Sequence, residues 1–185
     1  MLPALRARLL PKDDALSRFD DATAAVAILL RGEGAIEVLL TERATRESDP
    51  WSGQWSFPGG RRQAGESLFE TACRETEEEI GLSPRGSDVV GCLPARSPGN
   101  RQKMIVLPFV FHWTGGGEPR PGPEVASTAW VSLAELPKTR TTTTIHIRGR
   151  EFEMPAFVSG SRTIWGFTYR LLEDLLEVLP SELRA

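Results

Sequence analysis

The chain has 185 residues and a formal net charge of −3, and 40% of its residues are hydrophobic while 25% are charged. This is enough sequence for one domain with its own core, and the slight acidic excess argues against a nucleic-acid-binding protein. No apolar run approaches the roughly 20 residues of a membrane helix, so we expect no membrane partner. Cys73 and Cys92 form no metal-site pattern and indicate no disulfide framework, so we expect a reducing, cytoplasmic location.

The N-terminal segment has a basic start but lacks the long apolar core and the small-residue cleavage site of a signal peptide. We interpret it as a short surface helix, with an organelle-targeting segment as the alternative. No internal repeat divides the rest of the chain. We therefore expect a single domain over residues 1–185, with an N-terminal extension at 1–20, a core at 21–140, and a C-terminal hairpin and helix at 141–185.

The core begins with two apolar segments of strand length, residues 22–30 and 35–41, and the glycine-containing turn between them predicts a hairpin. Residues 44–54 are polar and contain Pro50 and Gly53, so we expect a loop there. Strands before and after a central helix predict an α/β (α+β) fold with a mixed sheet covered by helices. Further strands are predicted at 89–93, 104–113 and 128–133, a second hairpin at 142–147 and 151–157, and a terminal helix at 163–179.

The central helix is predicted to start at Ser67 and to stop at Gly81, after Ile80. Ser67 and Glu70 have the spacing of a capping box, and glycine is the common residue just past a helix C-terminus. Between these two ends an apolar stripe at helical spacing can be buried against the sheet. It consists of Phe69, Ala72, Cys73, Thr76 and Ile80.

Another face of the same helix carries Glu75, Glu78 and Glu79, because residues three and four apart are neighbours on a helix. A solvated charged face is the alternative interpretation, but such a face normally mixes in Lys or Arg at i+4. Like charges at this spacing destabilise the helix by a few tenths of a kcal/mol, roughly, and a divalent cation with oxygen ligands would remove the repulsion. Arg74 can brace either Glu70 or Glu78.

The residues just before this helix strengthen the metal hypothesis. Phe57 and Pro58 are followed by Gly59 and Gly60, and two glycines let a backbone turn tightly and approach a ligand closely. A carbonyl from this turn could reach the same cation.

From Gly60 to Leu82 the chain resembles the signature of the Nudix hydrolase family, G-x5-E-x7-R-E-U-x-E-E-x-G-U, where U is an aliphatic residue. The departure is Thr76 at the first U position, where a branched side chain of similar volume should still pack. The matching residues are Gly60, Glu66, Arg74, Glu75, Glu78, Glu79, Gly81 and Leu82.

This resemblance implies a Nudix-type α/β/α sandwich with a central mixed sheet, in which the signature forms a loop, a helix and a loop. It also implies hydrolysis of a nucleoside diphosphate linked to another moiety, a small-molecule substrate. In such a site Mg²⁺, for which Mn²⁺ can substitute, is bound by the three box carboxylates and by the Gly59 carbonyl. The implied metal ligands are Glu75, Glu78, Glu79 and Gly59, and Arg74 would orient a catalytic glutamate, with Gly60 and Glu66 in support.

The chemistry also needs a group that accepts a proton from the attacking water. Glu78 is one candidate. Glu124, in a loop before the strand at 128–133, is the other, because family members often place a further carboxylate in this region. An exposed loop residue is the alternative interpretation of Glu124.

Residues upstream of the signature resemble the coenzyme A pyrophosphatase branch of the family, which has an LLTxR stretch, a Gly-Gln pair and then FPGG. These anchors are present at 39–43, 53–54 and 57–60, while residues 48–51 depart from the branch. Arg43, Trp51 and Arg101 are candidate substrate contacts, the arginines for phosphate and the tryptophan for stacking on a base.

Coenzyme A or its derivatives are therefore the expected substrates, and ADP-ribose, nucleotide sugars and damaged nucleoside triphosphates are the alternatives within the family. A non-catalytic nucleotide-sensing module on the same fold is the alternative of another class. Many relatives are homodimers, so a homodimer is the candidate assembly.

Overall fold

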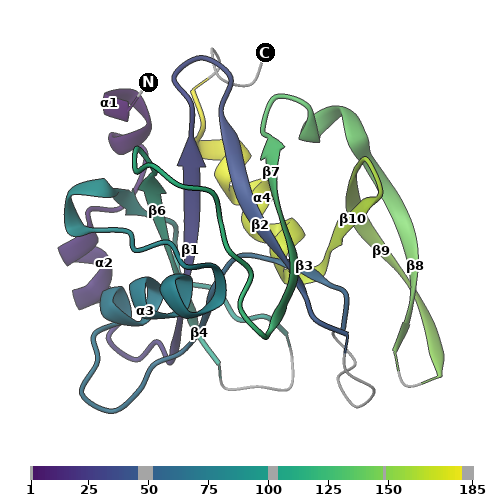
Figure 1. The fold of residues 1–185 in the computed structure, drawn as a ribbon, viewed down its shortest axis with the longest axis horizontal. Helices are drawn as coiled ribbons and strands as arrows, with labels where there is room; N and C mark the ends of the chain where they lie inside the picture. The colour runs from purple at the N-terminus through teal and green to yellow at the C-terminus, as the bar shows by residue number, and fades with distance from the viewer. Residues whose placement is uncertain (1, 46–51, 100–103, 148, 181–185) are drawn as a thin grey trace.

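The computed structural model describes residues 2–45, 52–99, 104–147 and 149–180. Across these ranges seven strands form one mixed sheet and three strands form a second sheet, with helices on both sides of the first (Figure 1). Within the same ranges, no helix has the length and apolar character needed to cross a membrane. Trp51 and Arg101, two of the predicted substrate contacts, lie outside the described residues.

The large sheet is built around β1 (Ala24–Arg31), which pairs in parallel with β6 (Val106–His112) along one edge. The other edge of β1 is divided: its end pairs with β2 (Glu37–Arg43), and its start pairs with the short β4 (Gly59–Arg61). This division places the Gly59–Gly60 backbone inside the sheet. The path of the sheet is β3-β2-β1-β6-β5, with β7 on β2; the remaining bounds are β3 Trp55–Ser56, β5 Val89–Cys92 and β7 Val125–Ser132.

Alternation along β1 sends its side chains into two separate cores, one on each face of the sheet. Ile28 and Leu30 pack in the cluster that contains α4 (Gly166–Val178), whereas Ala25, Ala27 and Leu29 pack in the cluster that contains α3 (Leu68–Ile80). The small alanine side chains on the α3 side allow that helix to lie close to β1. The predicted arrangement of helices on both faces of a mixed sheet is thus present.

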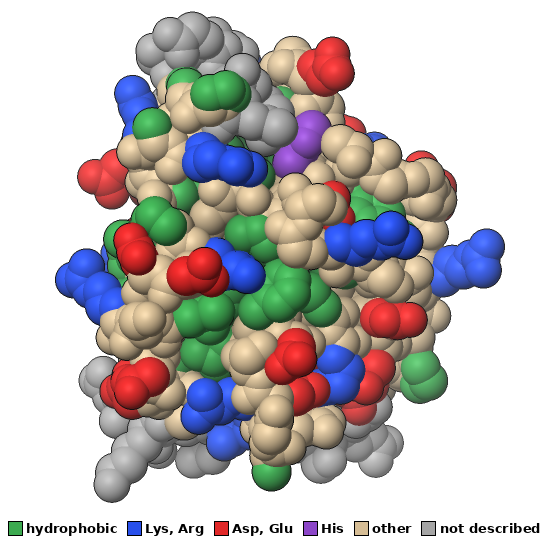
Figure 2. All heavy atoms as spheres, turned by 90° about the vertical axis from the view of Figure 1, so that its left-hand side faces the viewer, with side chains coloured by type: hydrophobic (Ala, Val, Ile, Leu, Met, Phe, Trp, Pro, Cys, Tyr) green, Lys and Arg blue, Asp and Glu red, His purple; other side chains and the backbone are tan. Residues whose placement is uncertain are grey.

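The N-terminal segment forms two helices, α1 (Leu2–Arg6) and α2 (Lys12–Arg18), where the sequence predicted one surface helix. The segment is also more deeply packed than expected, because Leu5 and Leu9 are buried in the core shared with α4. Figure 2 views the molecule from the side of α1 and α2 and shows a hydrophobic area surrounded by acidic and basic side chains.

The predicted strands at 22–30, 35–41, 89–93, 104–113 and 128–133 are confirmed as β1, β2, β5, β6 and β7. The second hairpin is confirmed as β8 (Arg140–Ile147) and β9 (Arg150–Ser159). The prediction for the last helix was wrong at its start, because β10 (Arg162–Trp165) pairs with β9 and α4 begins only at Gly166. The apolar Ile164 fits the spacing of either element, so periodicity could not locate this boundary. Short 3-10 helices lie at Gly86–Asp88 and Leu136–Thr139.

Candidate active site

Both predicted ends of the α3 helix are confirmed. The Ser67 hydroxyl accepts a hydrogen bond from the Glu70 backbone N–H at 3.2 Å, and the Glu70 carboxylate accepts from the Ser67 N–H at 2.8 Å, which completes the capping box. Gly81 adopts the left-handed conformation with φ of 68° and donates its N–H to the Glu77 carbonyl. The Glu70 carboxylate also accepts from the Ser67 hydroxyl at 2.8 Å, and the hydrogen bonds it accepts from the Ser67 backbone and hydroxyl lower the pKa of Glu70. Glu70 therefore serves the helix cap, and Arg74 braces other carboxylates.

The buried face of α3 comprises Leu68, Thr71, Ala72, Thr76 and Ile80, so Phe69 and Cys73 of the predicted stripe are only half-buried. Thr76 is completely buried, and its hydroxyl donates to the Ala72 carbonyl at 2.7 Å. The departure from the aliphatic residue of the signature therefore leaves no unsatisfied polar group. Burial also raises the pKa of the Cys73 thiol to about 11, which keeps it protonated and inert as a nucleophile.

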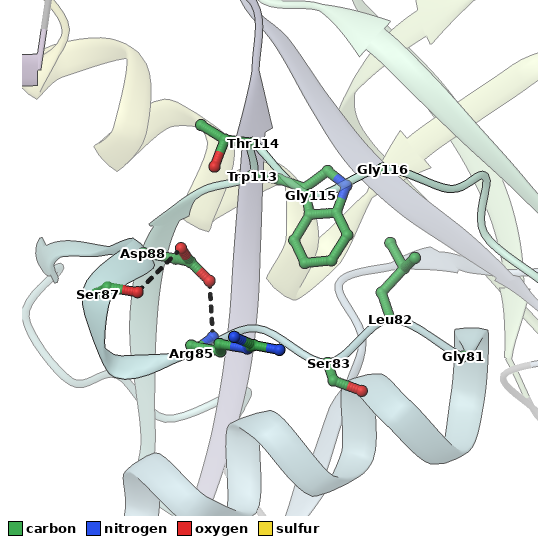
Figure 3. A pocket seen from close by; sticks show the side chains of 10 residues that line it. All are labelled: Gly81, Leu82, Ser83, Arg85, Ser87, Asp88, Trp113, Thr114, Gly115 and Gly116. Atoms are coloured by element: carbon green, nitrogen blue, oxygen red, sulfur yellow. Dashed lines mark hydrogen bonds between the residues drawn. The ribbon is translucent and has the colours of Figure 1, made fainter.

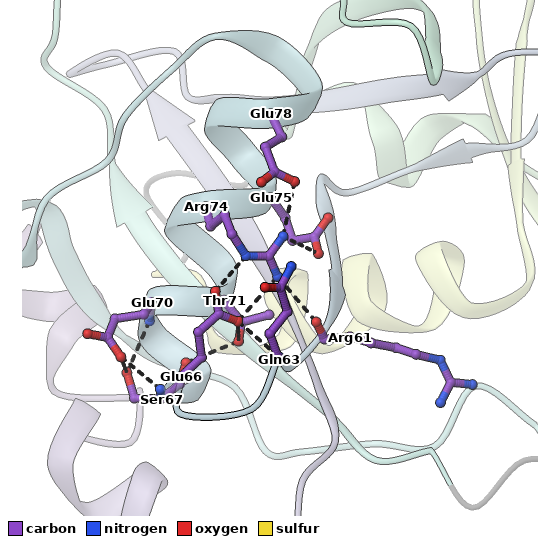
Figure 4. Close-up of polar contacts among 9 residues, drawn as sticks. All are labelled: Arg61, Gln63, Glu66, Ser67, Glu70, Thr71, Arg74, Glu75 and Glu78. Carbon is purple, nitrogen blue, oxygen red and sulfur yellow. Dashed lines mark hydrogen bonds and ion pairs between the residues drawn. The ribbon is translucent and has the colours of Figure 1, made fainter.

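Arg74 is the hub of a carboxylate network (Figure 4). Its Nε donates to Glu66 Oε1 at 2.5 Å, and its Nη1 lies 2.8 Å from Glu75 Oε1 and 3.0 Å from Glu78 Oε2. A further donor, Nη2, contacts the Arg61 carbonyl at 3.3 Å. The planar guanidinium thus fixes carboxylates on the helix and in the preceding loop at once, which a single ammonium group could not do.

Glu66 anchors Arg74 from the loop that precedes the helix. Its carboxylate accepts from Arg74, from the Gln63 backbone N–H at 3.1 Å and from the Thr71 hydroxyl at 2.9 Å. The hydrogen bond from Arg74 is the main reason that the pKa of Glu66 falls to about 2, with burial opposing the shift. The sequence did not single out Thr71, because helical spacing does not show that its hydroxyl contacts Glu66 in the preceding loop.

Glu79 is held in a different environment, without the Arg74 contact. Loss of hydration raises its pKa from 4.5 to about 8, a hydrogen bond from the Gly59 backbone opposes the rise, and the charges of Glu75 and Glu124 add to it. Arg43, at the end of β2, partly offsets these charges. Four segments therefore meet around the half-buried Glu79 carboxylate: the α3 helix, the glycine turn, the end of β2 and the Glu124 loop. The neighbouring groups do not fully stabilise its charged form.

Gly59 and Gly60 are required here for different steric reasons. A Cβ on Gly60 would lie 2.4 Å from Glu75 Oε1, so the carboxylate occupies the space of the missing side chain. A Cβ on Gly59 would lie 2.4 Å from the Ala25 carbonyl oxygen, in the neighbouring strand. The first contact is with the mobile end of a side chain, and the second is with backbone.

This difference predicts opposite behaviour of two alanine variants. Gly60→Ala should displace the Glu75 carboxylate and lower activity by about 10- to 100-fold, while the melting temperature changes little, because a side chain can move aside. Gly59→Ala should lower the melting temperature, because a strand backbone must shift. Thermal melting and turnover of both variants test this. Equal losses of stability in the two variants would contradict the assignment.

The structure places Glu124 at the start of β7, beside Arg43. The Ala44 backbone N–H donates to the Glu124 carbonyl at 2.9 Å, and the β2–β7 pairing shifts register at Arg43, which pairs with Val125. A bulge of this kind turns the backbone locally, and such bulges are frequent next to active sites.

An arginine and a tryptophan of the types that could contact a nucleotide, Arg96 and Trp55, are engaged elsewhere. Arg96 donates from Nε and from Nη2 to the two oxygens of the Asp174 carboxylate on α4, at 2.6 Å for the Nη2 contact. Trp55 is buried at 7% exposure, and the Arg162 guanidinium lies over its ring. Arg43 is the substrate candidate that the described residues bring to the carboxylates.

A cavity of about 530 Å³ lies beyond the C-terminal end of α3 (Figure 3). Trp113 and Arg85 approach it from opposite sides, above and below in this view, and Gly81 and Leu82 line it near the helix end. None of the three box glutamates, Glu75, Glu78 and Glu79, is among its lining residues. The volume of this cavity therefore does not identify the carboxylate site, which is defined by charge and contacts instead.

The carboxylates suit a cation that retains water ligands. Among the residues that the structure describes, no three acidic, histidine or cysteine side chains are grouped so that they could hold a metal ion, and the Glu78 carboxylate is bound to Arg74. Mg²⁺ commonly takes only one or two protein carboxylates, together with waters and phosphate oxygens. The raised pKa of Glu79 means that its surroundings stabilise the charged carboxylate poorly, and a hard divalent cation would supply that stabilisation.

The model of the NUDIX domain family matches residues 21–149, well over half of the chain. The chain belongs to the NUDIX domain family. This Nudix chain is 35% identical over 182 residues to the human (Homo sapiens) protein named mitochondrial coenzyme A diphosphatase NUDT8, covering 93% of this chain and 75% of that protein. Its identity to the Mus musculus protein of the same name is 32% over 183 residues, covering 93% of this chain and 85% of the relative.

A solved structure shares the Nudix fold. The NUDIX domain of Shewanella oneidensis NrtR, solved in complex with ADP ribose, superposes with a TM-score of 0.59 at 18% identity, over 86% of this chain and 88% of that one. The predicted fold class and the prediction of a Nudix hydrolase are both confirmed. Nudix hydrolases generally use divalent metal ions and act on small nucleoside diphosphate compounds.

Proposed function

We propose that this Nudix hydrolase cleaves the pyrophosphate bond of coenzyme A or its derivatives in a reaction that depends on Mg²⁺. The observation that carries the proposal is the Gly59–Gly60 turn closed against Glu79 and Glu75, with Arg74 bracing Glu75 from the same helix. The substrate is supported by two relatives, each matched over 93% of this chain and named as coenzyme A diphosphatases.

Glu75, Glu78 and Glu79 would hold the cation together with the Gly59 carbonyl, and Mn²⁺ would substitute for Mg²⁺. A bound divalent ion neutralises the charge of a pyrophosphate group and lowers the pKa of a bound water. Before the cation binds, Arg74 is paired with both Glu75 and Glu78, and Gly60 leaves room for the Glu75 carboxylate.

We assign Glu124 as the general base that accepts a proton from the attacking water. Its backbone is fixed next to Arg43 by the hydrogen bond from Ala44, and its charge reaches Glu79. The carboxylate of Glu78, the other candidate, already accepts a hydrogen bond from the Arg74 guanidinium at 3.0 Å. Arg43 stands at the same place with a positive charge that suits a phosphate group, and the sequence adds Trp51 and Arg101 as substrate contacts.

Mass spectrometry of the products tests the proposal. Incubation with coenzyme A and Mg²⁺ should release 4′-phosphopantetheine and 3′,5′-ADP, and chelation of the metal should stop the reaction. Parallel incubations with ADP-ribose, a nucleotide sugar and an oxidised nucleoside triphosphate set the selectivity. Hydrolysis of one of these compounds with coenzyme A left intact would make that compound the assigned substrate. Tight nucleotide binding without any hydrolysis would favour the sensing module.

Two further proposals come from the sequence alone. The cytoplasmic location rests on the unpaired cysteines, whereas both coenzyme A relatives are named as mitochondrial, so imaging of the tagged protein in its own cell decides between the compartments. The homodimer rests on the family resemblance, and light scattering of the purified protein measures the mass directly.

A further inference from the structure

The segment between β6 and β7 closes the C-terminal end of α3. The Arg120 backbone N–H donates to the Ile80 carbonyl at 2.7 Å, and the Gly122 N–H donates to the Glu79 carbonyl at 2.7 Å. The last carbonyls of a helix have no partner within the helix, so this segment satisfies two of them. Figure 1 shows the connection running from β6 past the end of α3 to the start of β7.

Gly122 lies closer to the helix than any other residue type would allow. A Cβ at this position would be 2.6 Å from the Glu78 carbonyl oxygen and 3.3 Å from the Glu79 carbonyl oxygen. The obstacle is backbone, and the helix end cannot retreat because Ile80 is fully buried. An added methyl group must therefore push the loop away from the helix.

The same loop carries Glu124, two residues further on. The Val125 N–H donates to the Gly122 carbonyl at 3.1 Å and closes a tight turn, and the Glu124 carbonyl accepts from the Ala44 N–H at 2.9 Å. Glu124 is thus held between a contact with α3 on one side and a contact with the end of β2 on the other.

We propose that Gly122 is a positioning residue: its close approach to the last turn of α3 sets the position of Glu124 relative to the carboxylates of that helix. The inference rests on the proposed function, in which Glu124 accepts the proton. Gly122 contributes no atom to the reaction itself, and it acts through the path of the loop.

Gly122→Ala is the direct test, with Gly116→Ala as the matched control, because a Cβ on Gly116 would meet nothing within 4 Å in the same connection. A displacement of about 1 Å can cost roughly 100-fold in rate, so kcat of Gly122→Ala should fall about 10- to 100-fold while KM stays within about threefold. Gly116→Ala should retain wild-type kcat. In a Glu124→Gln background, Gly122→Ala should cause no further loss, because both changes remove the same function.

Amide hydrogen exchange gives a readout that does not depend on turnover. The amides at positions 122 and 44 should be protected in the wild-type protein, and Gly122→Ala should lose this protection while Gly116→Ala keeps it. Unprotected amides in the wild type, wild-type kcat in Gly122→Ala, or an equal loss in the Glu124→Gln background would each overturn the positioning role. A wild-type protein that hydrolyses none of the substrates would instead refute the proposed function.

Discussion

Replacing Glu79 with glutamine is expected to lower turnover by at least about 100-fold and to abolish most of the stabilisation that Mg²⁺ gives the fold. Second-shell partners of a metal typically contribute 10- to 100-fold, roughly, to affinity or activity, and a direct ligand should contribute no less. A cation that binds only the folded state raises the melting temperature, so the loss of its ligand reduces that rise.

Without metal the same substitution is expected to stabilise the protein at neutral and basic pH. The folded-state pKa of Glu79 is about 8, above the ordinary value of 4.5, so its favourable contribution is fully present below pH 4.5 and is lost as the pH rises through about 8. The loss is on the order of a few kcal/mol, and glutamine, which carries no charge, avoids it. The melting temperature of the metal-free variant should therefore exceed that of the wild type at pH 8.

Melting curves between pH 4.5 and 9, recorded with a chelator and then with Mg²⁺, measure both effects. Glu77→Gln is the matched control, because Glu77 lies on the same helix with an exposed side chain and makes none of the Arg74 contacts. A Glu79→Gln protein that keeps normal turnover and a normal response to Mg²⁺ would contradict the assignment of this carboxylate.

Arg74→Met should produce the second large effect, a combined loss of stability and activity. The guanidinium is the shared partner of Glu66, Glu75 and Glu78, and the side chains of Arg74, Glu66 and Glu75 are only 18–21% exposed. Removing the cation leaves like charges facing each other with little hydration, for which we expect a loss of about 2–4 kcal/mol. For a chain of this length that corresponds to a fall in melting temperature of roughly 5–15 °C.

Arg74→Lys separates the charge of Arg74 from its geometry. Lysine keeps one positive charge but cannot reach three carboxylates and the Arg61 carbonyl at once, so it should recover part of the stability and little of the turnover. Arg62→Met is the control, because Arg62 is exposed in the loop that precedes α3. This variant should melt like the wild type. Full activity in Arg74→Lys would show that the network needs only charge.

Local features of the site could be predicted from the sequence because they depend on short-range rules. The Ser67–Glu70 capping box and the Gly81 stop follow from spacing along one helix, and the structure has both of them. The Nudix signature then identified the family, which the match over residues 21–149 confirms.

Contacts between segments distant in the sequence could not be predicted in the same way. The Gly122 bond to Glu79 spans the connection between two strands, and nothing in the sequence distinguishes Gly122 from a glycine in an open loop. Arg74 was expected to choose between Glu70 and Glu78, yet the loop brings Glu66 to it, and the capping box occupies Glu70. β3 and β4 are two and three residues long, too short for any periodic signal.

Diffraction from crystals soaked in Mn²⁺, with data collected near the manganese absorption edge, tests the metal site most directly. We expect an anomalous peak bordered by the carboxylates of Glu75, Glu78 and Glu79 and adjacent to the Gly59 carbonyl, with Glu78 released from Arg74. A map without a peak there, in which Glu78 still binds Arg74 and Glu79 still faces the Gly59 N–H, would contradict it.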